Sequence, residues 1–330
     1  MWSQLQSVLW PLILTFAAVT LAQDFGYGGK HGPEHWGEDY KKCSGKFQSP
    51  ININVLNVKF KTYWPFTYEN FDATPKRVHL TNNGHTVLVT MDFDKDKVPR
   101  VKGGPLERKT FYQFEQFHFH WGENDTVGSE DLIDNHAYPA ELHVVMRSLD
   151  YPDFQSALNK DHGLTVFAFF FTIMADDNPN YREFAEMLGS IDRKGKSVDL
   201  PNPLPLLKFL GTNLEGYYTY IGSLTTPPCA EEVVWVDFTE PIAISEYQLS
   251  HFRLLTANDD HLKNNFRPTQ PLNDRIVYRN EPTDDDLFMP WSSIPFVDAD
   301  NAAGCLPYGV VGAISAGIGC LLFGLSRTLF

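Results

Sequence analysis

The stretch Phe111-Tyr-Gln-Phe-Glu-Gln-Phe-His-Phe-His-Trp121 alternates polar and aromatic side chains along its second half. Successive side chains of a β-strand point to opposite faces, so this alternation predicts a strand. Gln116, His118 and His120 then share one face, and the aromatic residues between them occupy the other. The two imidazoles lie about 7 Å apart along such a strand. A His-x-His pattern alone is more often structural than metal-binding. The prediction of a metal site therefore requires a third ligand.

A second stretch, Ala140-Glu-Leu-His-Val-Val145, supplies that ligand by placing Glu141, His143 and Val145 on one face. Three histidines on two strands that can pair antiparallel form a trigonal base for tetrahedral zinc, with the fourth position open. This is the layout of a catalytic site. Gln116 and Glu141 each precede a histidine by two residues, where they can accept the second N–H of the imidazole.

The composition favours a β-rich fold. The chain has 330 residues, of which 14% are aromatic, and its 22 prolines and 23 glycines are typical of short strands joined by many turns. Helical patterns are short, the best at residues 181–188 and 245–255. Apolar or alternating runs bounded by turn residues predict strands at 78–82, 86–91, 111–121, 140–147, 164–172 and 233–236.

The N-terminal end has the features of a secretory signal peptide. Residues 8–18 form an apolar run too short to span a bilayer, and Thr20-Leu-Ala22 is a small-residue cleavage pattern. A buried N-terminal helix is the alternative, but it leaves the boundary at Ala22 unexplained. We therefore expect a signal peptide at 1–22 and a catalytic domain at 23–280.

The C-terminal end predicts a membrane anchor. Residues 281–304 are acidic and contain proline, as in a stalk, and the tail 305–330 begins with 22 uncharged residues that could just cross a bilayer as a helix. Only four residues follow, and small residues at 301–304 precede the tail, which favours a GPI signal. Ser292-Ser293 is an alternative attachment site with a better spacer. A transmembrane stub is the other reading of the tail.

The charge distribution argues against nucleic acid as a partner. The formal net charge is −14, the longest acidic run is Asp284-Asp-Asp286, and no basic residues cluster in the sequence. This pattern is typical of a soluble acidic surface.

Two cysteines, Cys43 and Cys229, remain in the folded part once the tail is set aside. In an oxidising compartment such a pair favours a disulfide over two unrelated buried thiols. A link across 186 residues stabilises by about 5 kcal/mol in the chain-entropy model. Asn124-Asp-Thr126 is the only N-glycosylation triplet in the chain, so we expect that a glycan on Asn124 is allowed but not required.

At this point the sequence resembles the α-class carbonic anhydrases, from residue 27 to residue 275. The motifs that carry the resemblance occur in the order and spacing of that family. They are Gly32-Pro-Glu-His-Trp36, Gln48-Ser-Pro50, Asn82-Asn-Gly-His85, Gly103-Gly-Pro-Leu106, Gln116-Phe-His-Phe-His-Trp-Gly122, Gly128-Ser-Glu130, Ala140-Glu-Leu-His143, Ser223-Leu-Thr-Thr-Pro-Pro228 and Arg267-Pro-Thr-Gln-Pro271.

The resemblance implies a mainly β single domain around a large, mostly antiparallel twisted sheet with a few short peripheral helices. It also implies Zn²⁺ on His118, His120 and His143, and reversible hydration of CO2 to bicarbonate and a proton by attack of zinc-bound hydroxide. Thr225 matches the family's gatekeeper threonine, which accepts from that hydroxide and donates to the carboxylate matched by Glu130.

Other site residues follow from the same resemblance. The apolar wall where CO2 rests is matched by residues that, taken singly, would be assigned to the core: Val145, Val166, Leu224 and Trp235. Thr226 is predicted as a further residue of the substrate pocket. His85 matches the proton-shuttle histidine at the cleft rim, which predicts a fast isoform, and Tyr27 and Asn83 match residues that order water on the way to it. Cys43 and Cys229 fall where secreted and membrane-bound members carry a disulfide, which would brace the loop ending at Pro228.

Two departures from the family pattern stand out. Asp131 occupies a place where the family usually has a histidine that supports the buried hydrogen bonds, and Leu88 replaces a position that is often polar on the cleft wall. The first puts the local hydrogen bonding in doubt. The second could change ordered waters and inhibitor selectivity.

Three functions remain to be weighed. The leading one is an active carbonic anhydrase at the cell surface, anchored to a membrane or secreted, acting on CO2 and bicarbonate. A catalytically silent binding module is the second, but silent members lose one or more zinc histidines. A zinc hydrolase acting on esters is the third, and it would need a substrate pocket beyond the CO2 wall.

Overall fold

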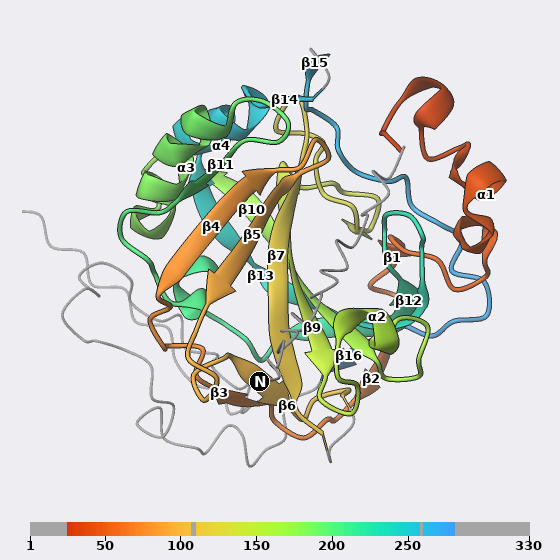
Figure 1. Cartoon of the computed structure of the whole chain (residues 1–330). Helices are drawn as coiled ribbons and strands as arrows, with labels where there is room; N and C mark the ends of the chain where they lie inside the picture. The colour runs from red at the N-terminus through yellow and green to blue at the C-terminus, as the bar shows by residue number, and fades with distance from the viewer. Residues whose placement is uncertain (1–24, 107–109, 258–259, 281–330) are drawn as a thin grey trace, which may run out of the picture. The chain divides into compact units, whose positions relative to one another are not determined.

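The computed structural model describes residues 25–106, 110–257 and 260–280 (Figure 1). The predicted signal peptide at 1–22, stalk at 281–304 and tail at 305–330 lie outside the described residues. No helix in the described ranges is long and apolar enough to cross a membrane.

One large sheet organises the described part of the chain, with most of its strands in the order β11-β4-β5-β7-β9-β10-β13-β12-β16-β2; β3 and β6 complete it beside β7. The central strands are long and the outer ones short. Their bounds are β2 Lys59–Lys61, β3 Thr67–Glu69, β4 Arg77–Asn82, β5 Val87–Asp92, β6 Arg100–Lys102, β7 Tyr112–Trp121, β9 Ala140–Ser148, β10 Leu164–Met174, β11 Ser197–Asp199, β12 Tyr217–Ser223, β13 Glu231–Ser245 and β16 Tyr278–Asn280. Two small pairs accompany the sheet: β1 Asn52–Ile53 with β8 Leu132–Ile133, and β14 Thr256–Ala257 with β15 Asp260–His261.

The sheet is mostly antiparallel, as predicted. β10 with β13 and β16 with β2 are the parallel pairs of the large sheet in the described ranges. All six strands expected from the sequence are present, and β13 continues nine residues past the predicted 233–236 run. Strands β2, β3, β6, β11, β12 and β16 of the large sheet were not predicted. Five of them are three residues long and bury at most one residue, and β12 is buried along almost its whole length, so none shows a clear alternating pattern.

Alternation along the strands separates two buried clusters. On β7, β9 and β10 the residues Phe117, Val144 and Phe167 pack into one extensive aromatic core. Their neighbours Val145 and Val166 belong instead to a smaller cluster on the opposite face. The predicted metal ligands project toward this second face, so the large core stiffens the strands without filling the site.

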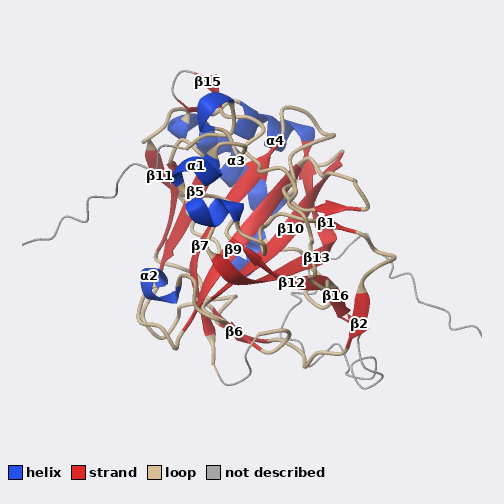
Figure 2. Cartoon of the chain, turned by 90° about the vertical axis from the view of Figure 1, so that its right-hand side faces the viewer, coloured by secondary structure: helices blue, strands red, loops and turns tan. Residues whose placement is uncertain are grey.

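The helices are few, short and peripheral, as predicted (Figure 2). α3 (Arg182–Leu188) and α4 (Glu246–Arg253) lie together and pack Phe184 and Phe252 against Phe119 of β7. α4 begins with a capping box, in which the Ser245 side chain accepts from the backbone N–H of Gln248. The remaining helices are α1 (Trp36–Asp39), α2 (Phe154–Ala157) and five 3-10 turns: Gly29–His31, Lys41–Ser44, Pro179–Tyr181, Gly189–Ile191 and Leu206–Phe209.

Candidate metal centre

The three predicted ligands meet on the face of β7 and β9 that lines the smaller cluster. His118 and His143 are directly opposite each other in the antiparallel register, and His120 follows two residues along β7. One ring nitrogen from each lies within 4.8 Å of the other two. In the described residues this is the only group of three or more histidine, cysteine or acidic side chains that could hold a metal ion.

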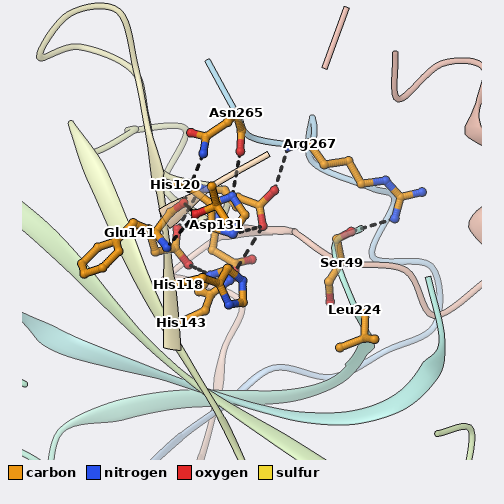
Figure 3. A network of polar contacts seen from close by, with 12 residues as sticks. Ser49, His118, His120, Asp131, Glu141, His143, Leu224, Asn265 and Arg267 are labelled. Atoms are coloured by element: carbon orange, nitrogen blue, oxygen red, sulfur yellow. Dashed lines mark hydrogen bonds and ion pairs between the residues drawn. The ribbon is translucent and has the colours of Figure 1, made fainter. Parts of the chain in front are cut away.

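Each imidazole has one ring nitrogen that faces the other two histidines, and an oxygen atom within hydrogen-bond distance of its second ring nitrogen orients the ring (Figure 3). His118 Nδ1 lies 2.9 Å from Gln116 Oε1, and His143 Nε2 lies 2.7 Å from Glu141 Oε1. His120 Nδ1 lies 2.7 Å from the backbone oxygen of Asn265. The sequence analysis proposed the first two partners. It missed the third, because a backbone carbonyl 145 residues away leaves no signal in side-chain identity.

These contacts leave three unprotonated nitrogens facing a common point. Burial lowers the pKa of all three imidazoles, in the case of His143 to about 3, so they are neutral at physiological pH. His120 Nε2 is buried without a hydrogen-bond partner in the described structure, and Glu130 Oε2, equally unpartnered, lies only 3.3 Å away. Two lone pairs at that distance repel each other unless a proton or a metal cation lies close by. The residues therefore fit Zn²⁺, which prefers neutral imidazoles in a tetrahedral set.

Glu130 is fully buried beside the histidines. Its Oε1 accepts the backbone N–H of Arg267 at 2.7 Å. Burial raises the pKa of Glu130, whereas the Thr225 side chain and the Arg267 amide, as hydrogen-bonding neighbours, lower it. A divalent cation at the histidines would also lower the pKa of Glu130, because an opposite charge favours the carboxylate.

Glu141 connects the ligand His143 to the loop that carries Glu130. Its Oε1 holds His143, and its Oε2 accepts the backbone N–H groups of Glu130 and Asp131 at 2.8 and 3.0 Å. Burial raises the pKa of Glu141 to about 8, while the two amides lower it. One side chain thus fixes both a metal ligand and the position of a second carboxylate.

Asp131, the departure from the family pattern, is also buried and hydrogen-bonded. Its Oδ1 accepts from the backbone N–H of Ile51 at 2.6 Å and from the hydroxyl of Tyr220 at 3.2 Å. The Tyr220 hydroxyl is in turn 3.0 Å from Ser49 Oγ, which accepts the backbone N–H of Ser223 in the predicted active-site loop. Asp131 therefore links that loop to β1, and burial raises the pKa of its carboxyl.

A cavity of about 380 Å³ opens above two of the histidines. All five residues of the predicted substrate pocket line it, together with Thr225 and Gln116. Phe154, Gln155 and Leu158, from α2 and the residue after it, line the cavity as well. These three were not predicted, because a four-residue helix gives too short a pattern to place on the site.

The three residues predicted for proton transfer are not among those that line the cavity. Tyr27 is close enough to Glu130 for that carboxylate to raise the pKa of the phenol, although burial is the larger cause. Asn83 Oδ1 accepts the backbone N–H groups of His85 and Thr86, both at 2.9 Å, so part of this side chain closes the turn after β4.

The His85 ring is stacked on Phe25, with ring centroids 4.0 Å apart and planes tilted by 10°. Burial, together with a smaller contribution from the positive charge of Lys194, lowers the pKa of His85 to about 4. A shuttle is most effective when its pKa is near the working pH. In this arrangement His85 is neutral at pH 7 and binds a proton only weakly.

Four other residues singled out in the sequence are placed as follows. Cys43 and Cys229 form the predicted disulfide, with Cα atoms 4.9 Å apart. Cys229 directly follows the loop that lines the cavity. Asn124 is exposed, with its Oδ1 accepting from the backbone N–H of Thr126. Leu88 is opposite His118 in the β5–β7 pairing, so an apolar side chain flanks that ligand.

Three neutral imidazoles, each oriented by its own contact, lie beside a half-apolar cavity. A structural zinc site has four protein ligands, whereas a site with three ligands and an open fourth position is that of a zinc enzyme that activates water. The model of the eukaryotic-type carbonic anhydrase family matches residues 31–281. The chain belongs to this family, and it is a carbonic anhydrase, an enzyme of reversible CO2 hydration.

Two human relatives agree with this assignment. The chain is 39% identical over 261 residues to carbonic anhydrase 7, a match that covers 77% of this chain and 96% of the relative. It is 34% identical over 269 residues to carbonic anhydrase 3, covering 78% of this chain and 98% of the relative.

Proposed function

We propose that this enzyme hydrates CO2 at the extracellular face of a membrane, with Zn²⁺ held by His118, His120 and His143. The convergence of three buried, neutral imidazoles, each held by an outer oxygen, carries the proposal. A bound zinc ion is a Lewis acid that acidifies water near neutral pH, an effect for which carbonic anhydrase is itself the standard example.

The protein's own part in the reaction is to orient the reactants. Thr225 is buried at the cavity wall as a neighbour of Glu130, and in the proposed reaction its hydroxyl donates to that carboxylate, which leaves its oxygen to accept a hydrogen bond from the attacking oxygen. That constraint points a lone pair of the nucleophile at the carbon of CO2. Glu130 performs this role as the carboxylate.

The apolar side of the cavity holds CO2 without hydrogen bonds. Val145, Val166 and Trp235 are each about 2% exposed or less, so they form a fixed surface. Leu224 and Thr226 complete it from the loop. CO2 binds such a wall weakly, and charged bicarbonate gains little from it and is released into water.

The proton leaves through the rim. Tyr27 and Asn83 order the intervening water, and His85 passes the proton to buffer. Because the pKa of His85 is lowered to about 4, its protonated form is short-lived at pH 7. The proposal therefore makes proton transfer, rather than attack on CO2, the slower stage in weak buffer.

The location rests on the sequence ends. A signal peptide at 1–22, the Cys43–Cys229 disulfide and an uncharged tail at 305–326 together favour a cell-surface enzyme, with a GPI anchor preferred over a transmembrane stub. A glycan on Asn124 is compatible with this location, because that side chain is exposed.

CO2 hydration, measured with and without a sulfonamide on wild type and on His118→Ala, tests the activity. We expect sulfonamide-sensitive activity in the wild type and its loss in the variant. An equally active variant would contradict the site. Treatment of intact cells with phosphatidylinositol-specific phospholipase tests the anchor, and we expect the enzyme in the supernatant. Activity that stays with the membrane indicates a transmembrane tail, and activity in untreated medium indicates secretion.

The geometry disfavours the first alternative function and is compatible with the second only as a side activity. A silent binding module would lack part of the ligand set, whereas all three histidines and their outer oxygens are in place. An ester hydrolase needs room for an acyl and an alkoxy group. The cavity could admit small esters, so a weak esterase activity beside CO2 hydration is the expected outcome.

A further inference from the structure

The edge of the large sheet at β2 has an unusual surface for this protein. Residues 51–68 contain no acidic residue, although the chain carries a net charge of −14. Within this stretch Leu56 is 89% exposed, Phe60 61% and Trp64 62%. Lys59 and Lys61, which precede and follow Phe60 and project from the opposite face of this edge strand, are exposed as well. Large apolar side chains at this exposure are uncommon on the surface of a soluble domain when they gather in one place.

The fold adds a third cation to this edge. β16 pairs in parallel with β2 and places Arg279 opposite Phe60. The Arg279 guanidinium lies 5.9 Å from the Phe60 ring centroid, and Lys61 Nζ lies 4.7 Å from that of Tyr63. None of the three cations has an ion pair with a described residue. We call Leu56, Lys59, Phe60, Lys61, Trp64 and Arg279 the β2 rim.

Protection of the sheet edge does not explain the β2 rim. Lysines on an edge strand do discourage pairing with another chain. That role requires no exposed leucine, phenylalanine and tryptophan, which have the opposite tendency. Aromatic rings flanked by lysine and arginine are instead the composition found at the interface of a bilayer, where the rings lie at headgroup level and the cations reach lipid phosphates.

The chain itself leads from the β2 rim toward the predicted anchor. β16 is the last described strand, and Asn280, its final residue, is directly opposite Lys61. Only the 24 residues 281–304 separate it from the apolar tail, a span of roughly 80 Å at most. A tether of this length keeps the domain at a high effective concentration near the membrane, so even a weak surface contact becomes populated.

We propose that the β2 rim is a membrane-docking surface, which inserts Leu56, Phe60 and Trp64 among phospholipid headgroups and sets Lys59, Lys61 and Arg279 against lipid phosphates. This inference rests on the proposed membrane anchoring. It gives the tethered domain a preferred orientation, with the β2 edge of the sheet toward the bilayer.

The full chain in phosphatidylcholine vesicles provides the test. Tryptophan fluorescence is measured in vesicles with and without bromine on the acyl chains. The contribution of Trp64 is the difference in fluorescence between wild type and Trp64→Phe. We expect bromine to reduce that contribution roughly twofold, because an interfacial ring contacts the upper acyl chains. Exchange of Lys59 and Lys61 for Glu together with Phe60→Ser should abolish the effect while CO2 hydration is kept. A matched change of two exposed lysines elsewhere, Lys42→Glu with Lys208→Glu, should leave it intact.

The possible failures are distinguishable. A chain that floats with the vesicles but shows an unquenched Trp64 keeps the anchor and overturns the docking surface. A chain that does not float with them overturns the anchor and the docking surface together. Quenching that appears only after Glu281 and residues 284–286 are neutralised would show that this acidic segment covers the β2 rim instead, which also contradicts the proposal.

Discussion

The histidines of the metal centre and the histidine at the rim are held in different ways. His118, His120 and His143 each contact an oxygen through one ring nitrogen at 2.7–2.9 Å. For the ring of His85 no such hydrogen bond is found among the described residues, and its main contact is a stacked Phe25. The metal ligands are thus fixed by directional bonds on rigid strands. The rim histidine is fixed by packing, which lowers its pKa but leaves its orientation less constrained.

This difference divides the enzyme into a precise part and an adjustable part. Attack on CO2 depends on atoms whose positions are set by the β7–β9 register. Substitutions that move these atoms should therefore lower the hydration rate strongly. Proton release depends on the burial of one ring and on a nearby charge, which single substitutions can shift. We therefore expect effects to decrease from the metal centre to the rim.

Thr225→Ala gives the largest effect short of removing a ligand. Loss of the hydroxyl leaves the nucleophile unoriented, and kcat/KM for hydration should fall on the order of 100-fold, as when one preorganised hydrogen bond is removed from an active site. Stopped-flow hydration assays measure this. Thr225→Ser keeps the hydroxyl and serves as the control. If the alanine and serine variants are equally active, the hydroxyl has no orienting role.

Gln116→Ala tests the outer oxygens. Without its partner the His118 ring can rotate and lose basicity, so zinc affinity should fall about 10- to 100-fold. Competition with a chelator measures this affinity. Gln116→Glu, which keeps an acceptor oxygen, should bind zinc at least as well as wild type. An unchanged affinity in the alanine variant would mean that the strand alone positions His118.

His85→Ala tests the rim. Turnover in weak buffer should fall roughly tenfold, less than the largest effects of general acid–base groups because the pKa of His85 is already low. Added imidazole should restore the rate, and kcat/KM should not change. If turnover is the same with and without imidazole, His85 is not the shuttle.

Phe25→Ala should give the smallest effect on turnover, and it should raise turnover rather than lower it. Exposing the ring of His85 removes the main cause of its low pKa, so the pKa should rise from about 4 toward 6.5 and turnover in weak buffer should increase a few-fold. An NMR titration of the ring follows the pKa.

The low pKa of His85 also affects stability. Between pH 6.5 and 4 the native His85 stays neutral while His85 in the unfolded chain binds a proton, so the stability that His85 contributes is lost as the pH falls through this window. The variant should lose less stability over that window. A pKa that stays near 4 would exclude Phe25 as its cause.

The sequence alone predicted the central strands and the ligands because both depend on short-range patterns. Alternation at residues 116–120 and 141–145 sets which side chains share a face, and β7 and β9 then bring the two faces together. Asn265, Phe25 and α2 could not be predicted in the same way. They reach the site through a backbone carbonyl, a long-range stacking contact and a four-residue helix.

Asp131 and the β2 rim illustrate the same limit. The sequence marked Asp131 as a departure, but only the fold shows that Ile51 and Tyr220 supply its hydrogen bonds. No basic residues cluster in the sequence, yet β16 places Arg279 opposite Phe60 of β2, between Lys59 and Lys61, from more than 200 residues away. Pairings of this kind depend on tertiary topology, which local patterns do not encode.

Removal and return of the metal tests the central claim most directly. The purified enzyme is dialysed against a chelator, and zinc content and CO2 hydration are followed as zinc is added back. We predict that hydration disappears with the zinc and returns in proportion to it, reaching full activity at one ion per chain, while His118→Ala regains neither at the same zinc concentration. Metal-free enzyme that still hydrates CO2, or a His118→Ala variant that recovers fully, would contradict the account.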